Sequence, residues 1–193
     1  MTGRRPEYES LAESVRRLND LTIRTEVDEV VALAAKARIE AAVDLLGQAT
    51  MPGSFGMRQS DDGQGVVAGN VLIGLRNPVA PPLTVHHEPD GTVWTEFTLG
   101  AVYEGPPGHV HGGICALVLD HVLGATAHQP GRPAYTGTLT LRYRRGTPLG
   151  ALRAWARVDR IEGRKTFAVG TIADQEGITV EAEGVFIFRH DNV

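Results

Sequence analysis

The chain of 193 residues has a single cysteine, few aromatic side chains and no excess of basic residues. One thiol, that of Cys115, cannot build an internal disulfide framework, so disulfide-stapled folds are excluded. A formal net charge of −4 does not suit a protein that binds nucleic acid or an anionic membrane through a broad basic surface. We therefore expect no nucleic-acid partner, and any basic binding site has to be local.

Long apolar runs are missing as well. No stretch reaches the roughly 18 apolar residues that a membrane-spanning helix needs, and the start of the chain lacks the apolar core of a signal peptide. The sequence therefore predicts a cytoplasmic protein without a membrane span. Neither the G-x-S-x-G motif of serine α/β-hydrolases nor the G-x-x-x-x-G-K-[ST] loop of P-loop ATPases occurs, which argues against both classes.

The rest of the sequence divides into two parts. Over residues 6–48, apolar residues recur at helical spacing between charged ones, which predicts two helices or one helix broken near residues 21–25. Residues 51–65 are rich in glycine, proline and polar side chains, as linkers are. We expect an amino-terminal helical extension over residues 1–50, a linker over 51–65 and one domain over 66–193. The extension could serve as a lid, a dimer contact or a tetramer contact.

The predicted domain is rich in short strands. Residues 83–99 are typical of a hairpin around the Pro-Asp-Gly turn at 89–91, and residues 135–188 of three or four antiparallel strands. In the stretch TGTLTLRYRR, side chains alternate between two faces, which predicts a half-buried strand. One face carries Thr136, Thr138, Thr140, Arg142 and Arg144, and the other carries Leu139, Leu141 and Tyr143.

One helix interrupts the strands, over residues 112–128. It is apolar around nearly its whole circumference except for Asp120 and His121, so we expect it to be buried on all sides. An antiparallel sheet curled around one central helix is the simplest arrangement, which is an α+β fold. One sheet covers only part of a helix, and a second sheet from a symmetric partner would complete the burial. The pattern therefore predicts a homodimer.

Gly112 and Gly113 stand where this helix begins. The first N–H groups of a helix lack internal partners and carry partial positive charge, and glycine lets a ligand oxygen approach them. Such a helix start can hold an oxyanion or polarise a carbonyl group. Two glycines also permit a tight turn or close packing against a strand, so both interpretations stay open.

Asp120 lies seven residues beyond Gly113, on the order of 10 Å along the helix axis. It therefore cannot easily serve the start of its own helix. Across a two-fold axis, antiparallel copies of the helix would bring Asp120 of one subunit to Gly112 of the other. There the carboxylate could act as a general base on water or as a nucleophile that forms an anhydride. Alternatively, it could cap a loop or pair with an arginine.

Several other side chains could take part in binding. His109 and His111 form an H-x-H pair, but the glutamate that cupin metal sites place shortly after such a pair is missing, so we expect no metal. Cys115 lies one turn into the helix, and we expect it to pack in the core. Four basic residues could hold phosphates or could be solvated residues of strand edges. These are Arg142, Arg144, Arg164 and Lys165.

The string GPPGHVHGGICALVLDHVLG resembles the hot-dog-fold acyl-CoA thioesterases of the hydroxybenzoyl-CoA and phenylacetate-pathway type, in particular the group that includes the carboxy-terminal modulator protein. The strand TGTLTLRYRR and the turn at residues 162–165 match further motifs of that group in the same order. The resemblance covers about residues 66–189. It implies a hot-dog fold and the hydrolysis of an acyl-CoA thioester to the free acid and coenzyme A.

The resemblance also implies roles for individual residues. His111 and Gly112 would shape the oxyanion site, and Gly113 would continue the helix start. Asp120 would come from the partner subunit as the catalytic acid, and the hydroxyl of Thr136 would help to place the attacking water. The four basic residues would hold the coenzyme A phosphates, and no cofactor is expected beyond the coenzyme A of the substrate. The assembly would be a homodimer or a dimer of dimers.

One departure concerns substrate orientation. Many phenylacetate-type enzymes carry asparagine six residues before the motif histidine, where this chain has Gly105, so orientation would depend on His111. Two other functions fit the same fold: a hydratase or dehydratase acting on enoyl-CoA, and a non-catalytic acyl-CoA-binding protein whose amino-terminal helices bind a partner. The length of the acyl chain depends on packing at the dimer contact, which the sequence does not specify.

Overall fold

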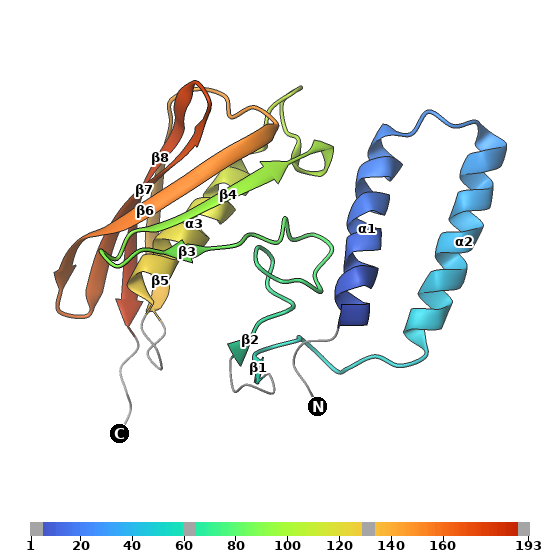
Figure 1. The fold of residues 1–193 in the computed structure, drawn as a ribbon, viewed down its shortest axis with the longest axis horizontal. Helices are drawn as coiled ribbons and strands as arrows, with labels where there is room; N and C mark the ends of the chain where they lie inside the picture. The colour runs from blue at the N-terminus through green and yellow to red at the C-terminus, as the bar shows by residue number, and fades with distance from the viewer. Residues whose placement is uncertain (1–5, 60–64, 129–133, 189–193) are drawn as a thin grey trace. The chain divides into compact units, whose positions relative to one another are not determined.

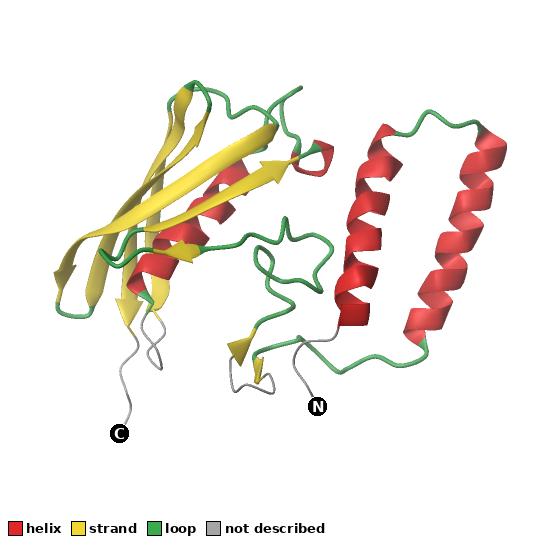
Figure 2. Cartoon of the chain, in the orientation of Figure 1, coloured by secondary structure: helices red, strands yellow, loops and turns green. Residues whose placement is uncertain are grey.

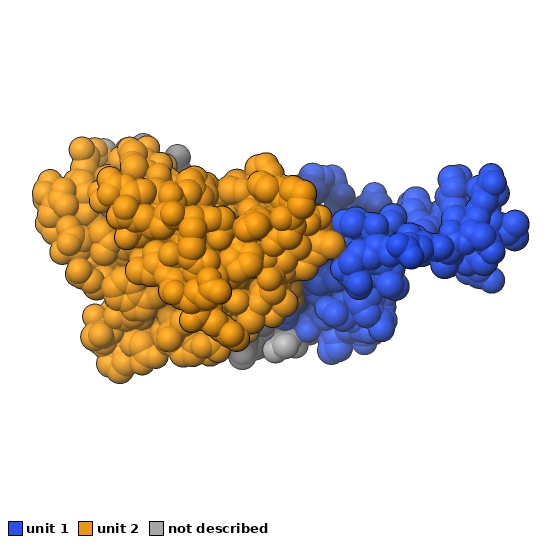
Figure 3. Space-filling view, turned by 90° about the horizontal axis from the view of Figure 1, so that it is seen from above, with its two compact units in different colours: residues 1–78 blue, residues 79–193 orange. Residues whose placement is uncertain are grey.

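The computed structural model describes residues 6–59, 65–128 and 134–188 (Figure 1). The chain forms two compact units, Met1–Pro78 and Val79–Val193 (Figure 3). The sequence places the start of the second domain at residue 66, whereas the first unit extends to Pro78. Residues 60–64 of the predicted linker lie outside the described residues. No helix among the described residues is long and apolar enough to cross a membrane.

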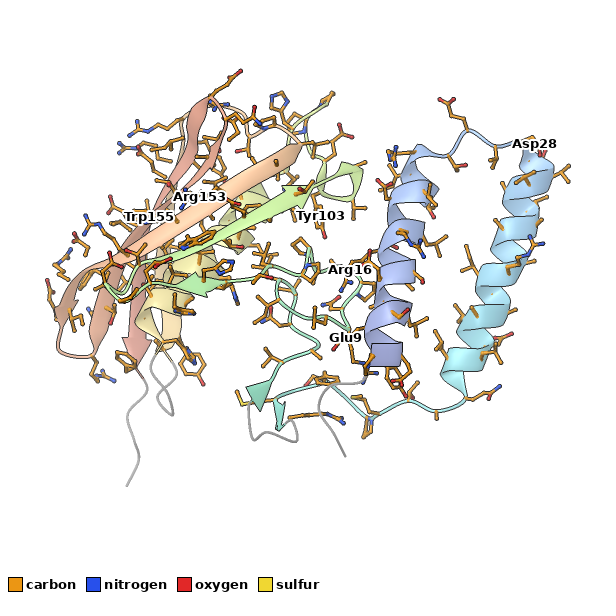
Figure 4. All side chains as sticks on the ribbon, viewed as in Figure 1. Glu9, Arg16, Asp28, Tyr103, Arg153 and Trp155 are labelled. Carbon is orange, nitrogen blue, oxygen red and sulfur yellow. The ribbon has the colours of Figure 1, made fainter. Side chains whose placement is uncertain are left out.

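The first unit contains two helices, as the sequence predicts. Helix α1 spans Pro6–Arg24 and α2 spans Glu29–Gly47, and the short strands β1 (Arg58–Gln59) and β2 (Gly65–Val66) pair antiparallel. Asp28 ends the break between the helices, because its side chain accepts a hydrogen bond from the N–H of Val31 and caps α2 (Figure 4).

The two helices of this unit differ in their packing. Arg16 of α1 donates to the carbonyl oxygens of three residues in a later turn of the same unit, and Ala12 of α1 is buried. These carbonyls belong to Gly74, Leu75 and Asn77. By contrast, every residue of α2 is exposed, including apolar ones such as Val30 and Leu45.

The second unit is a six-stranded antiparallel sheet with one long helix (Figure 2). The strands follow the order β3-β4-β6-β7-β8-β5. Their bounds are β3 His86–His87, β4 Val93–Leu99, β5 Ala134–Tyr143, β6 Gly150–Glu162, β7 Lys165–Asp174 and β8 Gly177–Phe188. Helix α3 spans Gly112–Ala127, and a short 3-10 helix, η1, spans Ala101–Tyr103. The predicted hairpin, the single helix and the four later strands are all present.

The sheet curls around α3 because its strands alternate between apolar and polar faces (Figure 1). On β6, Leu152 and Ala154 are buried, whereas Arg153 is exposed and Trp155 half-buried on the opposite face (Figure 4). The helix approaches closely at Leu123, where the sheet offers only glycine. A Cβ atom at Gly170 would lie 2.6 Å from Leu123 Cδ1, and one at Gly184 would lie 3.1 Å from Leu123 Cδ2. This is the expected hot-dog layout.

One face assignment is wrong. The sequence places Thr136 on the same face of β5 as Thr138, but the strand carries a β-bulge between these residues. Thr136 pairs with Phe186, which is buried under the helix, whereas Thr138 pairs with Val185. The extra residue turns Thr136 toward α3.

The surface of α3 has two sides. Six residues are buried against the sheet: Cys115, Val118, Leu119, Val122, Leu123 and Ala127. Another stripe runs through Gly113, which is exposed, and through Leu117 and His121, which are only half-buried. The sheet of one chain therefore covers one side of the helix, whereas the sequence predicts a helix that is buried on all sides.

Candidate active site

The loop before α3 fixes where the helix begins. His111 occupies the N-cap position, and its N–H donates to the carbonyl oxygen of Tyr103 (2.9 Å). Gly105 lies directly against it, since a Cβ atom at Gly105 would be 2.7 Å from His111 Cα. In this chain, the backbone of His111 therefore occupies the space that an asparagine side chain at position 105 would need, which agrees with glycine at this position.

The N–H groups at the helix start are almost all used. His111 Nδ1 accepts a hydrogen bond from the N–H of Gly113 (3.0 Å), and the His111 carbonyl oxygen accepts from the N–H of Ile114 (2.9 Å). The N–H of Gly112 has no partner among the described residues. Because the helix dipole adds partial positive charge there, this N–H can bind an anionic or carbonyl oxygen.

The His111 ring has a defined proton position. A nitrogen that accepts a hydrogen bond carries no proton, so neutral His111 has its proton on Nε2. The residue is exposed, and Nε2 has no partner among the described residues. The helix start therefore offers two donors, the N–H of Gly112 and the Nε2–H of His111.

Tyr143 is a member of this site that the sequence does not indicate. Its hydroxyl donates to the carbonyl oxygen of Gly112 (2.8 Å). Burial raises the pKa of the Tyr143 phenol, and the nearby Cys115 raises the pKa further. The phenol thus stays protonated at neutral pH, as a donor requires. The signals in the sequence were the apolar-face position of Tyr143 on its strand and its place in the stretch TGTLTLRYRR, which matches the resembled family.

Asp120 and Thr136 form a second group farther along α3. The Thr136 hydroxyl donates to Asp120 Oδ1 (2.7 Å), and the bulge in β5 makes this contact possible. Gly112 and Asp120 are eight positions apart on α3, about 12 Å of helix rise. Thr136 and Tyr143 are seven positions apart on β5, on the order of 20 Å. One chain therefore holds the two groups at separate places.

The four basic residues also form two groups in one chain. Arg142 pairs in register with Glu181 near the end of β5, and Arg144 forms an ion pair with the same glutamate. Arg164 and Lys165 are exposed at the start of β7. Lys165 pairs with Ile187 of β8, and Ile187 pairs with Tyr135 near the start of β5. This second pair of basic residues therefore lies at the other end of the sheet. The chain alone does not bring the four side chains together.

The remaining candidates are His109, His121 and Cys115. His109 Nδ1 lies 2.9 Å from the carbonyl oxygen of Pro107, and burial lowers the pKa of His121. Cys115 is buried as expected, and burial raises the pKa of its thiol. No group of three or more potential metal ligands occurs among the described residues.

Sequence comparison gives a match in the same region. The model of the thioesterase superfamily matches residues 107–181, which include the helix start, Asp120 and Thr136. Acyl-coenzyme A thioesterase THEM4 of Xenopus laevis is 34% identical over 93 residues, which make up 48% of this chain and 42% of that protein. The match thus spans less than half the length of this curated relative.

Solved structures extend the match to nearly the whole chain. A protein of Bacillus halodurans, solved with CoA, has a TM-score of 0.54 and 21% identity over 61% of this chain and 80% of its own, and it shares the fold. A crystal structure of a thioesterase superfamily protein has a TM-score of 0.78 and 34% identity, and the match covers 93% of this chain and 90% of that one. The chain therefore belongs to the thioesterase superfamily.

Proposed function

We propose that the protein hydrolyses acyl-CoA thioesters to a free acid and coenzyme A in a site shared between two subunits. The observation that carries this proposal is the unused N–H of Gly112 at the start of a largely buried helix. Such a donor is suited to the oxygen of a thioester carbonyl, which gains negative charge when the carbonyl carbon is attacked. The CoA bound by the Bacillus halodurans neighbour and the thioesterase name of the Xenopus relative support the substrate class.

The proposed homodimer forms along β5 and α3. Strand β5 is an edge of the sheet, with its outer side unpaired among the described residues, and most of its residues are exposed. Antiparallel pairing of β5 with its copy would join the two sheets and cover the half-buried stripe of α3. The two-fold rotation that relates the two chains would also bring the Gly112 end of one helix toward Asp120 of the other. A dimer of dimers is compatible with this contact.

The proposed reaction starts with the carbonyl oxygen at Gly112 N–H and His111 Nε2–H. Asp120 of the partner, held by its hydrogen bond to Thr136, removes a proton from water as the water oxygen bonds to the carbonyl carbon. The tetrahedral intermediate then expels the thiolate of coenzyme A, which takes up the proton. Asp120 could instead attack the carbon directly and form an anhydride that water opens. Hydrolysis in ¹⁸O-labelled water under single-turnover conditions distinguishes the two. Attack by water places one ¹⁸O in the product acid, whereas an anhydride that water opens at the Asp120 carboxyl carbon gives a first product acid without ¹⁸O, because the new oxygen of that acid comes from Asp120.

The coenzyme A phosphates would bind to basic residues of both subunits. Antiparallel pairing of β5 would bring Arg142 and Arg144 of one chain toward Arg164 and Lys165 of the other, since the two pairs lie at opposite ends of the sheet. Arginine forks suit phosphate oxygens. No cofactor takes part in this scheme. We place the reaction in the cytoplasm, as the sequence predicts.

The test is thiol release from a panel of acyl-CoA esters of graded chain length, with enoyl-CoA hydration measured in parallel. The proposal predicts thiol release from at least one ester, and a loss of about a hundredfold or more in Asp120→Asn. Hydration without thiol release would contradict it, and so would an Asp120→Asn protein with unchanged turnover.

A further inference from the structure

Hydrogen bonds run in series from the end of β5 into the His111 ring. Tyr143 Oη donates to the carbonyl oxygen of Gly112, and the N–H of the same peptide unit, on Gly113, donates to His111 Nδ1. We infer that Tyr143 is a positioning residue that fixes the orientation and the tautomer of His111 through the Gly112–Gly113 peptide. This inference rests on the proposed function, in which His111 Nε2–H faces the thioester carbonyl.

The geometry of the peptide unit makes the connection direct. A peptide unit is a rigid plane, so hydrogen bonds at its oxygen (2.8 Å) and at its nitrogen (3.0 Å) hold it from both ends. Bonds in series also polarise one another. The bond from Tyr143 therefore makes the N–H of Gly113 a stronger donor and favours the His111 tautomer that leaves Nδ1 unprotonated.

Packing at Gly112 supports the same role. A Cβ atom built on Gly112 would lie 3.2 Å from Tyr143 Oη and 3.4 Å from Tyr143 Cζ. The phenol thus lies directly against the backbone of the residue that offers the free N–H. A glycine at this position leaves room for the phenol, which then restricts the movement of the helix start.

The substitution Tyr143→Phe keeps the ring and removes only the hydroxyl. We expect kcat to fall about five- to tenfold, in line with the loss of one neutral hydrogen bond, and KM for acyl-CoA to change by less than about twofold. Tyr8→Phe is the matched control, since Tyr8 lies on α1 of the other compact unit and the substitution keeps the ring over which the Arg76 guanidinium lies. It should change neither constant.

A second readout does not depend on turnover. In protein labelled with ¹⁵N at histidine, at about pH 8, above the ordinary histidine pKa, the spectrum should show His111 with Nδ1 unprotonated and Nε2 protonated. The His111→Gln spectrum assigns these signals. Tyr143→Phe should shift His111 toward a mixture of tautomers, and Tyr8→Phe should not.

The two readouts separate failure of the inference from failure of the proposed function. If Tyr143→Phe keeps both the parental His111 tautomer and the parental kcat, the positioning role is wrong while hydrolysis stands. If no thioester is hydrolysed but the tautomer still shifts, the proposed function fails and the link from Tyr143 to His111 stands.

Discussion

At the level of single residues, the hydrogen bonds that each N–H at the start of α3 already makes decide which donors remain for a ligand. Gly113 gives its N–H to the His111 ring, which leaves Gly112 as the backbone donor without a partner among the described residues. The glycine pair thus has two separate tasks. Gly113 holds the histidine, and in the proposed mechanism Gly112 would donate to the thioester oxygen, with the phenol of Tyr143 packed against its backbone.

Replacement of Gly112 by proline tests the backbone donor directly. Gly112 is the first residue of α3, where proline is well tolerated, and the preceding His111 has φ −59° and ψ 132°, which suits a residue before proline. Gly112→Pro therefore removes the N–H in a backbone conformation that proline can adopt, while its Cβ would lie 3.2 Å from Tyr143 Oη and displace the phenol slightly. We expect kcat for acyl-CoA hydrolysis to fall about a hundredfold. Gly112→Ala adds a similar Cβ against the Tyr143 phenol but keeps the N–H, so it should lose much less activity than Gly112→Pro and measures the cost of the Cβ alone. Equal kcat values for the two variants would contradict the role of this N–H.

At the level of helices and strands, the spacing of apolar residues in the sequence was sufficient to predict most elements. The strand pattern over residues 135–188 and the apolar α3 predicted the sheet and its helix. The bulge in β5 was not predicted, because one extra residue reverses a face without changing composition. Gly137 inside the strand pattern was its only sign.

The contact between Tyr143 and Gly112 could not be predicted for a different reason. The residues lie 31 positions apart, and they meet only because the end of β5 passes the start of α3. Likewise, the family resemblance assigned Asp120 and Thr136 to one functional site without indicating that they hydrogen-bond within one chain. Pairings of this kind depend on how a strand crosses a helix, which local patterns do not encode.

The turn between β7 and β8 should make stability depend on acid pH. Arg145 donates to both carboxylate oxygens of Asp174 and to the carbonyl oxygen of Gly177. The hydrogen bond from Arg145 lowers the pKa of Asp174 from 3.8 to about 2. A carboxyl group with a lowered pKa in the folded state stabilises the fold above its ordinary pKa and loses this contribution as the pH falls from about 4 to about 2.

We therefore expect Asp174→Asn to reduce the free energy of unfolding at about pH 6 and to lose less stability than the parent on acidification. Urea unfolding at about pH 6 and about pH 3 measures both effects. Glu176→Gln is the control, because the Glu176 side chain is 84% exposed and its Oε2 lies as far as 4.0 Å from Arg145 Nη1, so this ion pair is weak. Parallel acid losses in the parent and Asp174→Asn would refute the prediction.

At the level of the whole molecule, each chain holds two groups of site residues, and neither group forms the proposed site by itself. One group contains Gly112, His111 and Tyr143, and the other contains Asp120 and Thr136. They lie about 12 Å apart along α3. In the proposed two-fold dimer, each group of one chain meets the complementary group of the other, so two sites form together and neither forms in a single chain.

The substitution Leu117→Glu should separate assembly from folding. Leu117 lies on the half-buried stripe of α3, between Gly113 and His121, and not among the residues buried against the sheet. A carboxylate there would be desolvated without a partner in the dimer, at a cost of several kcal/mol. We expect a folded monomer with at least about a hundredfold lower thiol release, as sedimentation, circular dichroism and turnover would report. Leu117→Met should remain an active dimer, and an active Leu117→Glu monomer would refute the shared site.

The most direct test of the shared site is a heterodimer of two inactive chains. One chain carries Gly112→Pro and the other Asp120→Asn, with different affinity tags so that only the mixed dimer is purified. The account predicts that each homodimer is inactive and that the heterodimer recovers about half of the parental thiol release, because one of its two sites combines an intact Gly112 with an intact Asp120. A heterodimer as inactive as both homodimers would contradict the account and place the whole site within one chain.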